Sequence, residues 1–165
     1  MKKLLIIIFL ISLLSSCTGT GNKTKPIITT SNSGNTILYF TRQGGYIAGG
    51  FREVNSPGGD AQFYLVKTDQ SGNQEWAKNL EQNGQDSYGD EIVEASDGGY
   101  VVAGSIFNGT DSDAYIMKIN SSGDVEWINT YGNSGNGDSE SFESIKNTLD
   151  GGYIAGGRIE ISWPG

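Results

Sequence analysis

The stretch Asp97-Gly98-Gly99-Tyr100-Val101-Val102-Ala103-Gly104 joins a glycine turn to an apolar run, and most of it occurs three times in the chain. It recurs 54 residues earlier as Gly44-Gly45-Tyr46-Ile47-Ala48-Gly49-Gly50 and 53 residues later as Gly151-Gly152-Tyr153-Ile154-Ala155-Gly156-Gly157. Asp-Gly and Gly-Gly pairs supply the positive φ angles that tight hairpin turns require. A repeat of this length is typical of proteins built from stacked supersecondary units.

A second block repeats at an offset of 51 residues: Tyr64-Leu65-Val66-Lys67 through Glu75-Trp76 returns as Tyr115-Ile116-Met117-Lys118 through Glu126-Trp127. Together the two blocks predict four strands in the second unit, at residues 91–96, 100–105, 114–119 and 125–130. The two middle runs are apolar at nearly every position, which is typical of strands covered on both faces. We therefore predict an all-β fold of four-stranded antiparallel units like the blades of a β-propeller.

Two protein families share these motifs. The blocks Asp97-Gly98-Gly99-Tyr100, Tyr115-x-x-Lys118 and Gly123-x-x-Glu126-Trp127 resemble repeats of bacterial secreted proteins and lipoproteins that are expected to be propellers. The Gly-x-x-x-Trp spacing is also similar to the tryptophan-docking motif of quinoprotein-type propellers, which implies that each Trp packs against the neighbouring blade. That motif has an Asp four residues before its glycine, whereas Asp69 stands three before Gly72 and Asn120 replaces it in the next unit. The resemblance, over residues 36–165, thus supports a blade fold far better than it supports a quinone cofactor, and we predict no cofactor.

The repeats divide the chain into units at about 36–83, 84–137 and 138–165, which makes about two and a half blades. Closed propellers have 4 to 8 blades, and open repeat arrays need capping ends. The third unit stops in or just after its second predicted strand. This pattern favours a truncated or interrupted reading frame, and the alternative is a short protein completed by self-association.

The N-terminus has the pattern of an export signal. Met1-Lys2-Lys3 precedes an apolar run at residues 4–14, whose helix of roughly 17 Å is too short for a hydrocarbon core of about 30 Å. Leu14-Ser15-Ser16-Cys17 resembles the lipobox of bacterial lipoproteins, in which the cysteine is acylated. We predict a signal peptide at 1–16, lipidation of Cys17 and a flexible tether at 17–35. Thr18, instead of Asp, favours the outer membrane.

Composition excludes several kinds of chemistry. The 165 residues include no histidine and one cysteine, with a net charge of -8. Without histidine there is no Ser-His-Asp or Cys-His nucleophile system, and one cysteine forms no intrachain disulfide. The negative charge argues against a nucleic-acid partner, because phosphate binding depends on Lys and Arg.

Several repeated residues are predicted to be structural. Trp and Tyr that recur in every unit, namely Trp76, Trp127, Tyr46, Tyr100 and Tyr153, are expected to pack between blades. Lys67 and Lys118 are expected to lie along the sheet and pair with Glu75 and Glu126 across a hairpin. The acidic clusters around Asp111 and Asp138 do not match a calcium loop, so they are interpreted as turn formers and no metal site is predicted.

The loops that differ between units lie on one rim, where recognition is usually housed. We predict binding by acidic and aromatic residues of this rim, for cationic or sugar-like partners: Asp86, Tyr88, Asp111, Asp113 and Asp138. In the alternative interpretation these loops are solvated spacers. The sequence favours a lipid-anchored binding or scaffold module that is not an enzyme. The alternatives are a fragment of a carboxylate-dependent hydrolase or quinoprotein-like enzyme, or a gene fragment without function.

Overall fold

A computed structural model describes residues 37–42, 44–53, 61–80, 84–132 and 137–162. Within these residues every regular element is a β-strand. No helix among them is long and apolar enough to cross a membrane. The predicted signal peptide and tether, Cys17 included, lie outside the described residues.

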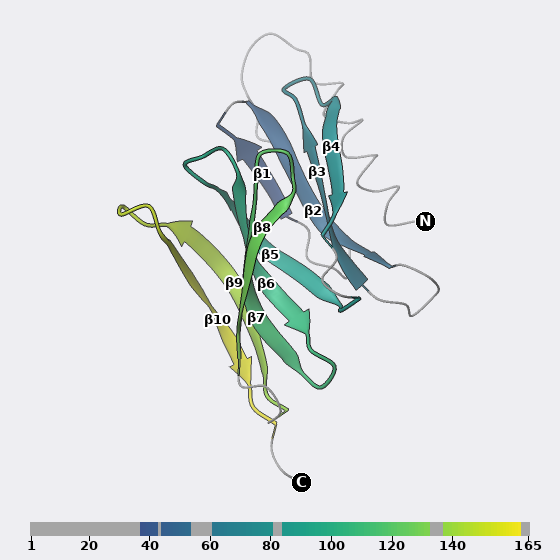
Figure 1. Ribbon diagram of the computed structural model, residues 1–165, viewed down its shortest axis with the longest axis vertical. Coiled ribbons are helices and arrows are strands. Elements are labelled where there is room, and N and C mark those ends of the chain that lie inside the picture. The colour runs from purple at the N-terminus through teal and green to yellow at the C-terminus, as the bar shows by residue number, and fades with distance from the viewer. Residues whose placement is uncertain (1–36, 43, 54–60, 81–83, 133–136, 163–165) are drawn as a thin grey trace.

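The strands form three antiparallel sheets that follow one another along the chain (Figure 1). The first sheet has the order β1 (Ile37–Thr41), β2 (Gly45–Glu53), β3 (Ala61–Thr68) and β4 (Gln74–Asn79). The second has the order β5 (Ser87–Glu94), β6 (Tyr100–Phe107), β7 (Ser112–Ile119) and β8 (Val125–Tyr131). A C-terminal hairpin consists of β9 (Ser139–Asn147) and β10 (Tyr153–Glu160). The predicted all-β antiparallel class is therefore confirmed, and the sheets of the described residues do not close into a ring.

The first strand of the second sheet differs from its predicted range. It was expected at 91–96, but β5 starts at Ser87 and ends at Glu94. A β-bulge explains the difference, because the pairing with β6 shifts between Gly89 and Glu91 and leaves Asp90 as the extra residue. The bulge lets the polar residues before it continue the strand. The sequence pattern there, with its Gly and Asp, did not predict a strand.

The hairpin turns have one hydrogen-bond pattern. At the β5–β6 turn, Ala95 N–H donates to Gly99 O at 2.8 Å and Gly98 N–H donates to Ala95 O at 3.2 Å. Gly98 has φ 82°, the left-handed conformation that completes a three-residue hairpin loop. The β7–β8 turn repeats the pattern with Gly123 at φ 84°. The Gly of the Asp-Gly-Gly motif therefore has the backbone conformation that the sequence predicted.

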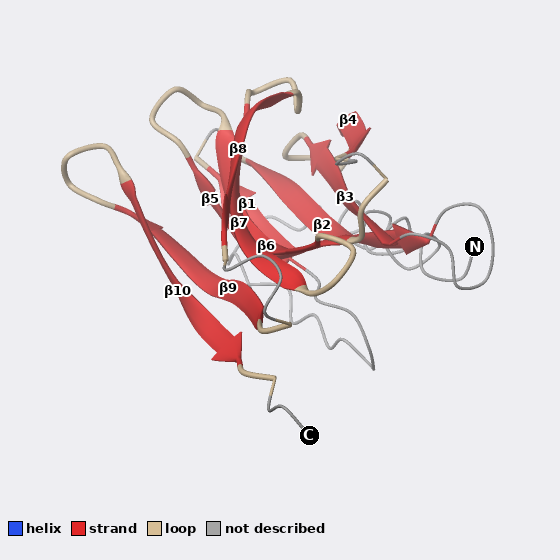
Figure 2. Cartoon of the chain, turned by 60° about the horizontal axis from the view of Figure 1, so that its bottom comes forward, coloured by secondary structure: helices blue, strands red, loops and turns tan. Residues whose placement is uncertain are grey.

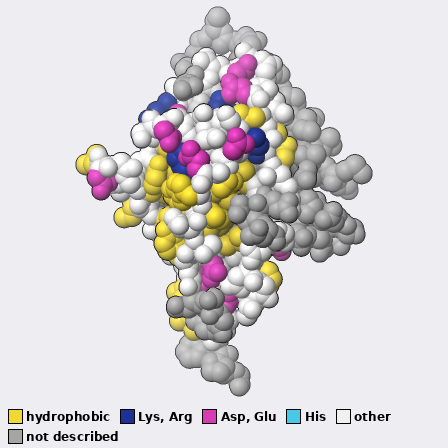
Figure 3. All heavy atoms as spheres, viewed as in Figure 1, with side chains coloured by type: hydrophobic (Ala, Val, Ile, Leu, Met, Phe, Trp, Pro, Cys, Tyr) yellow, Lys and Arg dark blue, Asp and Glu magenta, His cyan; other side chains and the backbone are white. Residues whose placement is uncertain are grey.

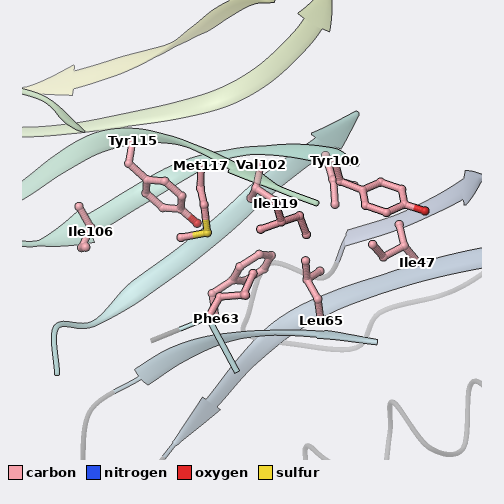
Figure 4. Packing of buried hydrophobic residues seen from close by; sticks show 11 residues of the cluster. Ile47, Phe63, Leu65, Tyr100, Val102, Ile106, Tyr115, Met117 and Ile119 are labelled. Carbon is pink, nitrogen blue, oxygen red and sulfur yellow. The ribbon is translucent and has the colours of Figure 1, made fainter. Parts of the chain in front are cut away.

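The second sheet is covered on both faces. One cluster of buried side chains lies between the first and second sheets (Figure 4). Another lies between the second sheet and the C-terminal hairpin. β5 packs against β1, β2 and β3, and β9 packs against β5, β6 and β7, so successive sheets stack in the same manner (Figure 2). Strands β6 and β7 are buried at most positions, which confirms the prediction from their continuous apolar runs.

Trp76 joins the first sheet to the second. Its Nε1 donates a hydrogen bond to Ser121 O at 3.0 Å, and its ring meets Tyr100 edge-on at a centroid distance of 6.4 Å. The ring also lies against Gly123, where an added Cβ would come within 3.0 Å of it. The expectation that Trp76 and Tyr100 pack between units is thereby confirmed. Trp127, the equivalent residue of the second sheet, is 39% exposed.

The repeated lysines pair as predicted. Lys67 forms an ion pair with Glu75, and Lys118 Nζ lies 2.7 Å from Glu126 Oε2 and 2.8 Å from Asp97 Oδ2. Burial would lower the pKa of Lys118, but the hydrogen bonds with Asp97 and Glu126 raise it. The buried ammonium therefore stays charged and connects two neighbouring turns of the second sheet.

A carboxylate of β5 fastens the C-terminal hairpin. Glu91 accepts hydrogen bonds from Ile145 N–H at 2.6 Å and from Ser144 Oγ at 2.8 Å, and it pairs with Lys146. Burial would raise the pKa of Glu91, but these hydrogen bonds together lower it. The carboxylate is therefore ionised at neutral pH and holds β9 in register against the second sheet.

We predict that Gly123→Ala destabilises the protein more than Gly98→Ala. Both glycines have positive φ, which costs a residue with a Cβ about 1–2 kcal/mol. An added Cβ at Gly98 meets nothing within 4 Å, whereas at Gly123 it meets Trp76 and Lys78 Cγ at 3.0 and 2.8 Å. Overpacking at Gly123 should cost about 1–3 kcal/mol more. Urea denaturation of the two variants measures the difference, and equal losses would show that Trp76 does not depend on this contact.

Candidate functional site

The predicted binding residues gather at one end of the stacked sheets. Strands β3, β5, β7 and β9 begin at this end and β6, β8 and β10 finish there, because every neighbouring pair is antiparallel. We call this end the acidic rim and define it by five residues: Asp86, Asp111, Asp113, Asp138 and Glu140. The opposite rim consists of the short hairpin turns, which include Asp97, Asp124 and Asp150.

Asp86 and Tyr88 lie where the first and second sheets meet. Asp86 Oδ1 accepts a hydrogen bond from Ala61 N–H at 2.6 Å, at the start of β3. The backbone oxygen of Asp86 accepts one from Phe107 N–H at 2.8 Å. The ring of Tyr88 packs edge-on against Phe51 at a centroid distance of 5.6 Å. Both residues therefore hold the sheet junction together.

Asp111 organises the β6–β7 loop. Its side chain is buried, and it accepts hydrogen bonds from Asn108 Nδ2 and, at 3.1 Å, from Gly137 N–H. Asn108 Nδ2 also donates to Asp113 Oδ2 at 3.2 Å. Because Gly137 directly precedes Asp138, the structure brings Asp111, Asp113 and Asp138 together. Asp86 lies at the other sheet junction.

Two carboxylates of the rim each have one oxygen without a hydrogen-bond donor among the described residues. Asp113 Oδ1 and Glu140 Oε2 are buried and have no hydrogen-bond partner within the described part of the chain, and the same holds for Ser141 Oγ. A Cβ placed on Gly132 would contact both carboxylates, so their oxygens lie close together on the side of the backbone to which that Cβ would point. Asp138, in contrast, accepts a hydrogen bond from Ser162 N–H at 2.8 Å. The Asp113–Glu140 pair is therefore where hydrogen-bond donors are missing.

A second acidic pair, which was not predicted, lies at the bulges of β5 and β9. Asp90 is the extra residue of β5, and Glu143 is the extra residue of β9. Burial and then the negative charge of Glu143 raise the pKa of Asp90 to about 6, while Arg158 opposes the shift. Arg158 Nε lies 3.5 Å from Glu143 Oε1. Burial, and then the charge of Asp90, also raises the pKa of Tyr115.

The sequence contained a signal for this second pair. The offset of 53 residues that relates Tyr100 to Tyr153 also relates Asp90 to Glu143. Aligning the units on their tyrosines would thus have placed an acid at the same position in both. The first-strand segment lacks the glycine motif, however, so no repeated block marks these two positions.

An open groove lies beside the rim, between β8 and the C-terminal hairpin. Its volume is about 520 Å³. Tyr131 and Phe142 meet edge-on in its wall, with centroids 5.4 Å apart. The lining also includes side chains of β7 and β10, among them Ala114, Ala155, Arg158 and Ile159. The groove is therefore apolar and aromatic on its walls, with one cation and the Glu140 carboxylate at its edge.

The described residues contain no group of three or more His, Cys, Asp or Glu side chains placed to hold a metal ion. Carboxylates that lack donors can accept hydrogen bonds from ammonium, guanidinium or hydroxyl groups.

No protein-family model and no curated protein matches the chain.

We predict that Asp90→Asn stabilises the protein at pH 7.5. The folded protein raises the pKa of Asp90 from 3.8 to about 6, so its charged form costs stability above pH 6. That cost is relieved as the pH falls from about 6 to about 4. The gain in the variant should be about 1 kcal/mol after allowance for solvent screening of a half-exposed group.

Urea denaturation between pH 4 and pH 8 measures the effect, and the wild-type protein should gain stability on acidification relative to Asp90→Asn. Glu143→Gln serves as the matched variant. It should weaken the same pH dependence, because it removes the neighbouring charge. A loss of stability in Asp90→Asn at pH 7.5 would show that the carboxylate is a favourable acceptor at this position.

Proposed function

We propose that this chain is an exported lipoprotein, held to the cell envelope by acyl chains on Cys17, and that it works as a binding or scaffold module. Its stacked sheets are proposed to be blades of a β-propeller, and the outer membrane is its proposed location. In this proposal the protein is not an enzyme and carries no cofactor.

The way in which successive sheets stack supports the propeller part of the proposal. Asp86 Oδ1 accepts from Ala61 N–H, and one sheet later Ser139 Oγ accepts from Ser112 N–H at 3.4 Å. These are equivalent positions, since Ala61 and Ser112 both begin the third strand of their sheet. The first strand of each new sheet thus meets the preceding sheet in the same way. Repetition of one geometry is how repeat proteins extend.

The observation that carries the binding function is the pair of unfilled acceptors at Asp113 and Glu140. A buried carboxylate oxygen without a partner costs free energy, and a bound donor recovers it. The neighbouring loops are held rigidly through Asp111 and Asn108, so little ordering is needed on binding. A partner that presents Lys or Arg side chains satisfies both the hydrogen bonding and the negative charge of the chain.

The binding proposal is tested with a short lysine-rich peptide. We predict that Asp113→Asn and Glu140→Gln each weaken its binding by about tenfold, because each removes one charged acceptor. Isothermal titration calorimetry at 50 mM salt gives the dissociation constants. Asp124→Asn, on the opposite rim, is the control and should leave binding unchanged. Equal effects of all three variants would reduce the interaction to net charge, and binding of neutral oligosaccharides in its place would identify a sugar as the partner.

The anchor is tested separately. We predict that cells expressing the chain incorporate radioactive palmitate into it and that the protein sediments with membranes. Cys17→Ser should abolish the label and release the protein, because the acyl chains supply the membrane affinity. A Ser16→Ala variant is the control, since it leaves the acylated sulfur in place. Wild-type protein that is unlabelled and soluble would contradict the lipoprotein proposal.

A further inference from the structure

An apolar face is open on β8 and the C-terminal hairpin. Exposed fractions are 39% for Trp127 and 47% for Tyr131 on β8 and 51% for Ile159 on β10, while Ile154, which is 63% exposed, lies on the other face of β10. Figure 3 shows hydrophobic side chains gathered over these strands. Among the described strands, β10 is hydrogen-bonded to β9 alone, so one of its edges presents unpaired backbone groups.

The second sheet shows what covers the same face one unit earlier. There, β7 pairs with β6 along its whole length, and the β7–β8 turn receives Trp76 through Ser121 O and Gly123. β6 and β10 are equivalent strands, since Tyr100 and Tyr153 share the repeated motif, and Trp127 is the equivalent of Trp76. The Trp76 contact is complete, whereas Trp127 remains exposed.

An aspartate of the opposite rim shows the same difference between the second and third units. In the second sheet, Asp97 Oδ2 lies 2.8 Å from Lys118 Nζ, which β7 contributes. Asp150 has the position of Asp97 in the third unit. Its carboxylate accepts hydrogen bonds from Thr148 Oγ1 and Gly152 N–H, within its own turn. A strand that pairs with β10 as β7 pairs with β6 would place a lysine beside Asp150.

The groove of about 520 Å³ corresponds to a region between the first two sheets that buried side chains fill. Its lining includes Ala114, Tyr131, Ala155 and Ile159, which are the equivalents of four members of the core cluster between the first two sheets: Phe63, Leu80, Val102 and Ile106. That cluster also contains Tyr115 and Met117 of β7, both fully buried (Figure 4). The groove therefore corresponds to the space that Tyr115 and Met117 fill in the second sheet. A strand that would supply their equivalents is not among the described ones.

We propose that this face binds a β-hairpin of the repeat's own chemistry: a Tyr-x-x-Lys strand, a glycine turn and a Glu-Trp strand. The first strand adds to the edge of β10, its Tyr enters the groove, its Lys pairs with Asp150, and its turn receives Trp127. This is strand addition to an exposed sheet edge, with side-chain pockets that give specificity. The edge of β10, Asp150 and Trp127 lie outside the acidic rim, whereas the groove shares Glu140 with it.

The occupant is a hairpin with a free strand edge, and a folded second copy of the chain does not offer one of this kind. In each copy the Tyr-x-x-Lys strand is already paired on both sides, β3 by β2 and β4, and β7 by β6 and β8. The donor is therefore a polypeptide segment in which this hairpin is not yet part of a complete sheet.

A peptide of residues 61–80 tests the proposal. It contains Tyr64, Lys67 and Trp76, and its two lysines balance its two acidic residues. Fluorescence anisotropy of the labelled peptide is measured with the full chain carrying Cys17→Ser. We expect saturable binding, protection of the amides of β10 from hydrogen exchange, and at least tenfold weaker binding of a Tyr64→Ala peptide.

Charge exchange provides the specific control. Asp150→Lys in the protein should weaken binding at least tenfold, and a Lys67→Asp peptide should bind this variant better than the wild-type peptide does. Far-ultraviolet circular dichroism verifies that the variant is folded. Equal binding of a scrambled peptide, no protection of β10, or no effect of the charge exchange would each overturn the proposal.

Discussion

Burial of both faces of the second sheet is the constraint on which the rest of the structure depends. Strands such as β6 and β7 are apolar on either side, so the sheet is stable only between two neighbours. The first sheet covers one face with Phe63 and Leu65, and the C-terminal hairpin covers the other with Ile145. Polar contacts then fix the spacing: Trp76 with Ser121 on one side, and Glu91 with Ile145 N–H on the other.

Much of the fold was predictable from the sequence, because the determining interactions repeat. The glycine turns, the continuous apolar runs and the pairing of Lys118 with Glu126 are local or cross-strand features that a repeat displays twice. The start of β5 was not predictable in this way. It depends on the bulge at Asp90, which exists because β6 pairs with both sides of it. Such a feature belongs to the pairing of two strands and has no signature in either strand alone.

The sequence predicted which acidic residues lie at the candidate site, but it predicted less well what each of them does there. The sequence pointed to Asp86 and Asp111 as ligand-binding residues, but in the fold both accept backbone N–H groups that hold loops and sheets together. The distance between sheets determines which acidic side chain of a loop accepts these N–H groups, and that distance is set by the tertiary structure. Asp113 and Glu140 keep acceptor atoms without a partner among the described residues, because both oxygens face Gly132, which has no side chain to donate to them. Geometry, more than residue type, separates structural from available carboxylates.

The two sheet junctions also show what the repeat conserves. At the first junction the large Phe63 lies over Gly89, where an added Cβ would come within 2.6 Å of the ring. At the second junction the equivalent residues are exchanged in size: Ala114 stands for Phe63 and Phe142 for Gly89. Summed volume is kept while the residues differ, as close packing demands of a core. A hairpin that adds to the edge of β10 is therefore constrained by the volume and charge left at β8 and β10.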